Sequence, residues 1–134
     1  MPFLFHTFAV HFPVALLLTS AVFDAVYLVT RERFYDRAGR FLIGLGLLGA
    51  LIAIILGFVD FMALVAADVG QAFVDQHRRH STFAYAGVAT YLASFLLRWR
   101  RPDLNRAAVG IFLVLGAGLI MWATWLGSHI RKVM

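Results

Sequence analysis

The chain has 134 residues, which is enough for a single domain. Hydrophobic residues make up 62% of it and charged residues 14%, whereas soluble domains are about half apolar and about a quarter charged. A soluble fold of this size would lack the polar side chains needed to cover so much apolar surface, so the composition predicts a protein embedded in lipid. The absence of cysteine excludes disulfides, thiolate metal sites and thiol catalysis.

Four apolar runs predict four transmembrane helices, over about residues 9–29, 41–67, 81–97 and 107–126. A membrane-spanning helix needs about 20 predominantly apolar residues. The connections between the runs are short, so consecutive helices are expected to be antiparallel neighbours. The sequence therefore predicts an all-α fold, an integral membrane four-helix up-down-up-down bundle that forms one domain over residues 1–134. No internal repeat is apparent from the residues alone.

The basic residues divide unevenly between the two ends of these runs. Eight of the 12 lie around the first and third connections, namely Arg31, Arg33, Arg37, Arg40, Arg98, Arg100, Arg101 and Arg106. The other four are Arg78, Arg79, Arg131 and Lys132. Because lysine and arginine concentrate in cytoplasmic loops, we expect a multi-pass protein of a bacterial inner membrane with both termini in the periplasm. The net charge of +5 is then explained by membrane topology, and no nucleic-acid partner is expected.

All five histidines fall on the predicted outer side, and they are His6, His11, His77, His80 and His129. A helix rises about 1.5 Å per residue, which places His11, Asp60 and His80 at nearly one depth, about 27–30 Å from the inner boundary. A carboxylate at such depth requires a partner, and a histidine ring N–H is the expected one for Asp60. Asp24, the other intramembrane acid, is expected to pair with an arginine of the inner loops.

Such a layer of side chains suits two chemistries. In the first, His11 and His80 ligate a b-type haem from diagonally opposed helices, Asp60 orients a ligand, and His129, His6 and His77 are reserve ligands. In the second, a single transition metal ion is held by two histidines and Asp60, with His77 or His129 as a further ligand. A scaffold subunit without a cofactor is the third hypothesis.

Several segments resemble a bacterial four-helix membrane family catalogued as domain of unknown function 2231. His6-Thr7-Phe8-Ala9-Val10-His11-Phe12-Pro13-Val14-Ala15-Leu16 is similar to its opening HPxxVHFPIAL signature, with Thr7 in place of the usual proline. Gly57-Phe58-Val59-Asp60-Phe61 resembles its GLLDL segment, His80 matches a histidine that opens its third helix, and Trp125-Leu126-Gly127-Ser128-His129 is similar to its closing WLGG segment. Some members of that family are joined to Rieske iron–sulfur domains, so the resemblance implies a redox role.

The leading expectation is therefore a membrane b-type haem electron-transfer protein, or a membrane subunit of a redox complex, with its cofactor near the outer face. The alternatives are a non-haem metal-binding or transport-related membrane protein that uses a His/Asp site, and the cofactor-free scaffold. Electron transfer or binding is expected rather than a stand-alone enzymatic activity. The expected partners are the lipid bilayer, a redox protein or quinone, and a second copy of the chain in a homodimer.

Overall fold

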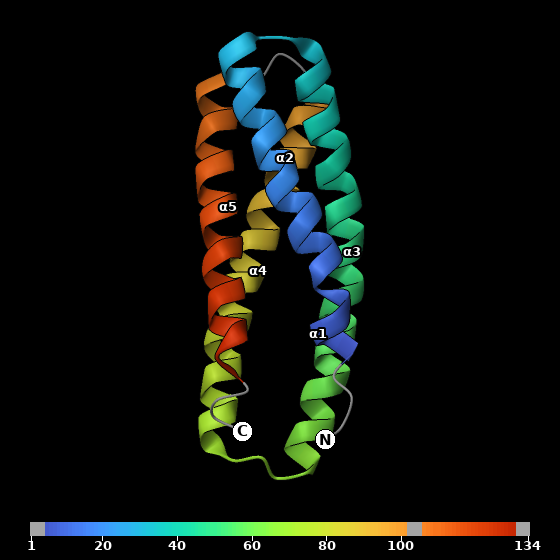
Figure 1. Cartoon of the computed structure of the whole chain (residues 1–134), viewed down its shortest axis with the longest axis vertical. Coiled ribbons are helices and arrows are strands. Elements are labelled where there is room, and N and C mark those ends of the chain that lie inside the picture. Colours follow the sequence, from blue (N-terminus) through green and yellow to red (C-terminus); the bar gives the residue numbers. More distant parts are fainter. Residues whose placement is uncertain (1–4, 102–105, 131–134) are drawn as a thin grey trace.

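The computed structural model of the chain describes residues 5–101 and 106–130. These residues form five helical segments and no strand: α1 (Phe5–Ala9), α2 (His11–Thr30), α3 (Arg33–Ala66), α4 (Gln71–Arg100) and α5 (Arg106–Ser128). Because α1 and α2 follow one another along one side, the segments make a bundle of four antiparallel helices (Figure 1). The predicted all-α membrane bundle is confirmed.

A short break at Val10 separates α1 from α2. Pro13 lies in the first turn of α2 and has no N–H to donate to a carbonyl four residues earlier. The chain still continues through this point, because the Val10 N–H donates to the His6 carbonyl and the Val14 N–H donates to the Val10 carbonyl. The two segments together therefore act as the first helix of the bundle.

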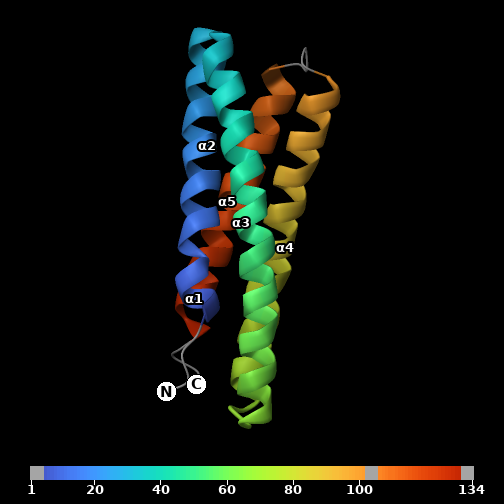
Figure 2. The same cartoon turned by 90° about the vertical axis from the view of Figure 1, so that its right-hand side faces the viewer.

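The helices are longer than the apolar runs that predicted them. α3 has 34 residues and α4 has 30, so at about 1.5 Å per residue both exceed a hydrocarbon core of about 30 Å. The loop that joins them lies beyond the ends of α1 and α5 (Figure 2). Among the described residues, three stretches are long and apolar enough to cross a membrane, Phe5–Thr30, Arg33–Ala66 and Arg106–Ser128. The residues of α4 are more polar on average than those of the other three.

The interior of the bundle receives one large side chain from each of the four helices. Leu17, Ile43, Tyr91 and Ile120 form a buried cluster. The outward faces are apolar too, with Phe12 68%, Phe41 67% and Val114 70% exposed. Apolar side chains on both the inner and the outer faces are what a bundle surrounded by lipid requires.

The structure reveals an internal repeat that inspection of the sequence did not find. Tyr91 lies 74 positions after Leu17, and its hydroxyl donates to the Leu17 carbonyl. Arg98 lies 74 positions after Asp24, and the two side chains are hydrogen bonded. Equivalent residues of α2 and α4 therefore meet one another along the centre of the bundle, as they do in an assembly with two-fold symmetry.

The second helices of the two halves, α3 and α5, also have equivalent residues, which are 70 positions apart. The sequence Ala53-Ile54-Ile55-Leu56-Gly57 in α3 corresponds to Ala123-Thr124-Trp125-Leu126-Gly127 in α5. Gly46 lies against the Leu17 side chain, and its counterpart Gly116 lies against the Tyr91 ring. The chain is thus two helical hairpins, α1–α3 and α4–α5, that pack alike and are related by an approximate two-fold axis along the bundle.

Candidate functional site

A pair of histidines from the two hairpins meets on this axis, at the end of the bundle that holds the α3–α4 loop, here called the histidine end. The rings of His6 and His80 have centroids 5.9 Å apart and planes inclined by 73°. Nδ1 of His6 donates to the Ala53 carbonyl at 2.6 Å, and Nδ1 of His80 donates to the Ala123 carbonyl at 2.7 Å. The same nitrogen is therefore engaged in both rings, and Nε2 of each makes no hydrogen bond with the described residues.

A glycine supports each ring from the adjacent helix. A Cβ placed on Gly57 would lie 2.8 Å from Nδ1 of His6, and one placed on Gly127 would lie 2.9 Å from Cε1 of His80. Both distances are shorter than a carbon side chain tolerates, so any larger residue at either glycine would displace the imidazole beside it. The repeated Ala-x-x-Leu-Gly segment thus supplies each histidine with a carbonyl acceptor and a close-packed surface.

Asp60 is buried beside the pair. Its Oδ2 accepts the backbone N–H of His6 at 2.8 Å. This N–H belongs to the first turn of α1, whose amides have no acceptor within their own helix. The partner of Asp60 is thus a histidine, as expected. However, His6 donates through its backbone amide rather than through a ring nitrogen. Asp60 fixes the start of α1 and with it the position of His6.

His77 extends the cluster toward the α3–α4 loop. Its ring stacks on Phe61 at 4.2 Å and lies 6.5 Å from the ring of His80. His77 precedes the expected third span, residues 81–97. Burial, together with the nearby rings of His80 and His6, lowers the pKa of its imidazole to about 4. The ring is therefore neutral at physiological pH.

The other two candidate histidines do not join this pair. His11 is exposed on α2, and its side chain makes no hydrogen bond or ring contact with the described residues. His129 follows the end of α5, where its ring packs on Trp125 at 4.2 Å and its Nδ1 donates to the Trp125 carbonyl at 2.8 Å. Among the predicted ligands, the structure pairs His80 with His6, places the His77 ring beside that of His80, and directs the Asp60 carboxylate to the backbone amide of His6.

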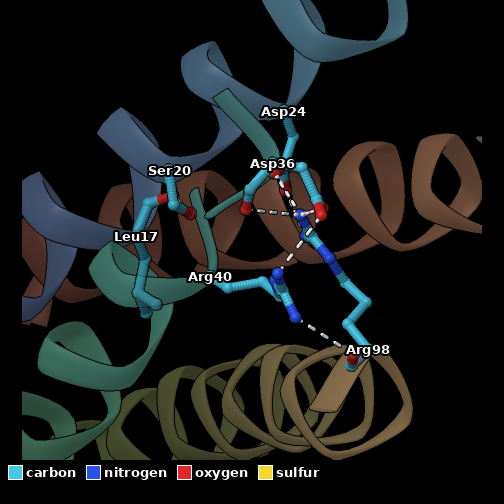
Figure 3. A network of polar contacts seen from close by, with 6 residues as sticks. All are labelled: Leu17, Ser20, Asp24, Asp36, Arg40 and Arg98. Atoms are coloured by element: carbon cyan, nitrogen blue, oxygen red, sulfur yellow. Dashed lines mark hydrogen bonds and ion pairs between the residues drawn. The ribbon is translucent and has the colours of Figure 1, made fainter. Parts of the chain in front are cut away.

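The opposite end of the bundle, here called the arginine end, is held by a buried ion-pair network (Figure 3). Arg98 is 2% exposed. Its two terminal nitrogens each donate to one carboxylate oxygen of Asp24 at 2.8 Å, and one of them also reaches Asp36 Oδ1 at 2.7 Å. The predicted pairing of Asp24 with an arginine is confirmed, and this arginine, Arg98, lies in the last turn of α4.

Two neighbours complete this network. Arg40 lies 3.4 Å from Asp36 and donates to the Arg98 carbonyl at 3.3 Å. Gly39 leaves the space that the Asp24 carboxylate occupies, because a Cβ there would overlap it. Two aspartates and two arginines balance in charge, which is how buried ions are usually retained. The network joins α2, α3 and α4 and is best explained as structural.

The fold and these two polar layers define a helical membrane protein with a paired-histidine site at one end. The family model described as predicted membrane protein (DUF2231) matches residues 3–132. The chain therefore belongs to that family, as its sequence resemblance indicated. No curated protein and no solved structure matches the chain.

Proposed function

We propose that this protein binds one b-type haem between His6 and His80 and transfers electrons within the membrane. The observation that carries the proposal is the pairing of these rings, with both Nδ1 atoms held by carbonyls and neither Nε2 atom hydrogen bonded to the described residues. His6 and His80 would hold the haem iron, one from each hairpin. Their ring centroids lie 5.9 Å apart, close enough for both side chains to contribute to one site.

The number of ligands favours haem over a single metal ion. The described part of the chain holds no group of three or more histidine, cysteine, aspartate or glutamate side chains placed to bind a metal. A non-haem zinc or iron site usually takes three or four protein ligands. A porphyrin supplies four nitrogens itself, so two histidines complete its coordination.

The surrounding residues would orient and tune the two ligands. The carbonyls of Ala53 and Ala123 fix each ring as the tautomer with a proton on Nδ1, and such hydrogen bonds raise the basicity of the other nitrogen. Asp60 holds the start of α1 and thereby the height of His6. A haem held by both His6 and His80 would supply one-electron transfer rather than oxygen binding.

The same proposal places the chain in the membrane. We infer that α4 crosses the bilayer with the other three helices, because it packs along α3 and α5 over the same height (Figure 2). The arginine end then faces the cytoplasm of a bacterial inner membrane, the histidine end faces the periplasm, and both termini are periplasmic. A quinone or a periplasmic redox protein would exchange electrons with a haem at that depth.

The visible spectrum of protein purified from haem-sufficient cells tests the proposal. We expect the bands of a low-spin b-type haem at one haem per chain, and loss of those bands in His80→Ala while circular dichroism still reports a helical protein. A colourless wild-type protein would overturn the proposal. In that case, a bound transition metal found by elemental analysis would favour the single-ion alternative, and a metal-free protein would favour the scaffold.

A further inference from the structure

A second candidate binding site lies far from the histidines, in the seam between α3 and α4 at the arginine end. A hollow of about 660 Å³ opens there, within the range of about 300–1,000 Å³ that is typical of small-molecule sites. Its walls are apolar, with Phe41, Leu45 and Leu48 from α3 facing Leu92, Phe95 and Leu96 from α4.

The hollow has the length of one lipid leaflet. Its lining on α3 extends from Arg37 to Leu48, which is about 16 Å at 1.5 Å per residue. The hydrocarbon core of a bilayer is about 30 Å thick, so a single leaflet contributes about half of that. An acyl chain that entered from the arginine end could therefore lie in the groove along most of its length.

The end of the hollow nearest the membrane surface is basic. Arg37 is exposed and makes no ion pair with any described residue. Arg40 also lines the hollow and is already paired with Asp36 at 3.4 Å. The nearby acids Asp24 and Asp36 already bind Arg98, and Glu32 is exposed at the start of α3. Trp99, which is 70% exposed, completes this end of the wall. Tryptophan at that position is typical of the lipid headgroup level.

The internal repeat shows that packing alone does not require these arginines. The positions that correspond to Arg37 and Arg40 in the second hairpin are Ala107 and Gly110. The seam between α5 and α2 is therefore formed without them, although it is related to the α3–α4 seam by the approximate two-fold axis. Arg40 also serves the ion-pair network through Asp36, and the other seam has Arg106, which is bonded to the Leu28 carbonyl. Arg37, which makes no ion pair with a described residue, is therefore the basic residue that points to a ligand at this seam.

We propose that this seam binds one anionic phospholipid from the leaflet at the arginine end. The phosphate lies at Arg37 and Arg40, and one acyl chain occupies the groove between α3 and α4. Basic pockets between transmembrane helices bind anionic headgroups in this way. The proposal does not depend on the haem, because it uses no residue of the histidine end.

Native mass spectrometry of the full chain with added phosphatidylglycerol or phosphatidylcholine tests this site. We expect one phosphatidylglycerol to bind in preference to phosphatidylcholine. Arg37→Gln should weaken that binding about fivefold, which corresponds to the loss of about 1 kcal/mol for one basic residue near a lipid surface. Arg100→Gln is the matched control, because Arg100 is exposed at the same end but does not line the groove.

A variant that fills the groove without changing the charge provides a second test. Gly44→Leu would direct its side chain against Phe95, since even a Cβ at Gly44 would lie 3.3 Å from that ring. We expect this variant to lose the bound phosphatidylglycerol while circular dichroism shows an unchanged helix content. Equal binding of the two lipids by the wild type, or unchanged phosphatidylglycerol binding by Arg37→Gln, would overturn the proposal.

Discussion

Asp24 and Arg98 occupy equivalent positions in the two hairpins and bind one another through two hydrogen bonds of 2.8 Å. In an assembly of two identical hairpins, like residues would face each other at this position. The fusion of both halves in one chain allows the two positions to differ, so that an acid meets a base. The approximate symmetry of the bundle therefore underlies both its ion-pair network and its histidine pair.

Removal of one member of the network should be strongly destabilising. Arg98→Met leaves the carboxylates of Asp24 and Asp36 buried without their main partner, and loss of one partner of a buried ion pair typically costs about 3–5 kcal/mol. Thermal or denaturant unfolding in detergent measures this loss. Arg100→Met is the control and should change stability by less than about 0.5 kcal/mol, because Arg100 is exposed.

An exchange of charges tests the two-fold relation itself. Asp24→Arg and Arg98→Asp should each destabilise the bundle when introduced alone, because each places like charges together. The double variant restores an acid opposite a base and should be more stable than either single variant. Its recovery should be incomplete, because Asp36, which binds Arg98, would lie beside a carboxylate at position 98. A double variant no more stable than either single one would show that the two positions are not equivalent.

The two glycines at the histidine pair should tolerate no larger side chain. Gly57→Ala and Gly127→Ala place a methyl group within 3 Å of an imidazole, and such overpacking usually costs about 1–3 kcal/mol. Gly118→Ala is the matched control in α5, because nothing lies within 4 Å of its added Cβ. That variant should be neutral or more stable by up to about 1 kcal/mol, since alanine favours a helix over glycine. Equal unfolding free energies for all three variants would contradict the close packing.

Asp60 should act through the amide of His6. Asp60→Asn keeps an oxygen that can accept this N–H, so the helix should start normally and any bound haem should be retained with a shifted potential. Asp60→Leu removes the acceptor and should cost about 0.5–2 kcal/mol, as the loss of a helix N-cap does. The unfolding free energy and the haem-to-protein ratio of both variants check this. Equal behaviour of the two would mean that Asp60 serves packing alone.

The orientation in the membrane is checked by fusions at the C-terminus. Alkaline phosphatase placed there should be active, because the predicted location of this end is the periplasm, and a green fluorescent protein should stay dark. The opposite pair of results would reverse the orientation and move the histidine end to the cytoplasm. Neither result would change the description of the bundle or of the histidine pair.

The general fold follows directly from the sequence, because long apolar runs with basic flanks have few alternatives to membrane helices. The partner of Asp24 was predictable for a related reason, since a deeply buried carboxylate needs a cation. The exact helix lengths could not be predicted, because α3 and α4 continue as helix into polar flanks such as Arg33-Phe34-Tyr35-Asp36. Apolar residues indicate which part of a helix contacts lipid, but they do not indicate the residue at which the helix ends.

Depth along the helix alone favours His11 as the partner of His80, whereas helical phase favours His6, which the structure places beside His80. His11 lies six residues before the buried Leu17, which at about 3.6 residues per turn puts it on a different face of the helix. His6 lies eleven residues before Leu17, close to three full turns, and His80 lies eleven residues before Tyr91. This shared spacing and the repeated Ala-x-x-Leu-Gly segment were the signals in the sequence that could have identified the pair.

A comparison of His6→Ala with His11→Ala tests the central claim most directly. Both variants remove one histidine from the first helix, five residues apart, and the measurement is the amount of haem per purified chain after expression in haem-sufficient cells. The paired-ring geometry predicts that His6→Ala loses its haem and that His11→Ala keeps one haem per chain with an unchanged low-spin spectrum. Loss of haem in His11→Ala together with its retention in His6→Ala would contradict the site described for His6 and His80.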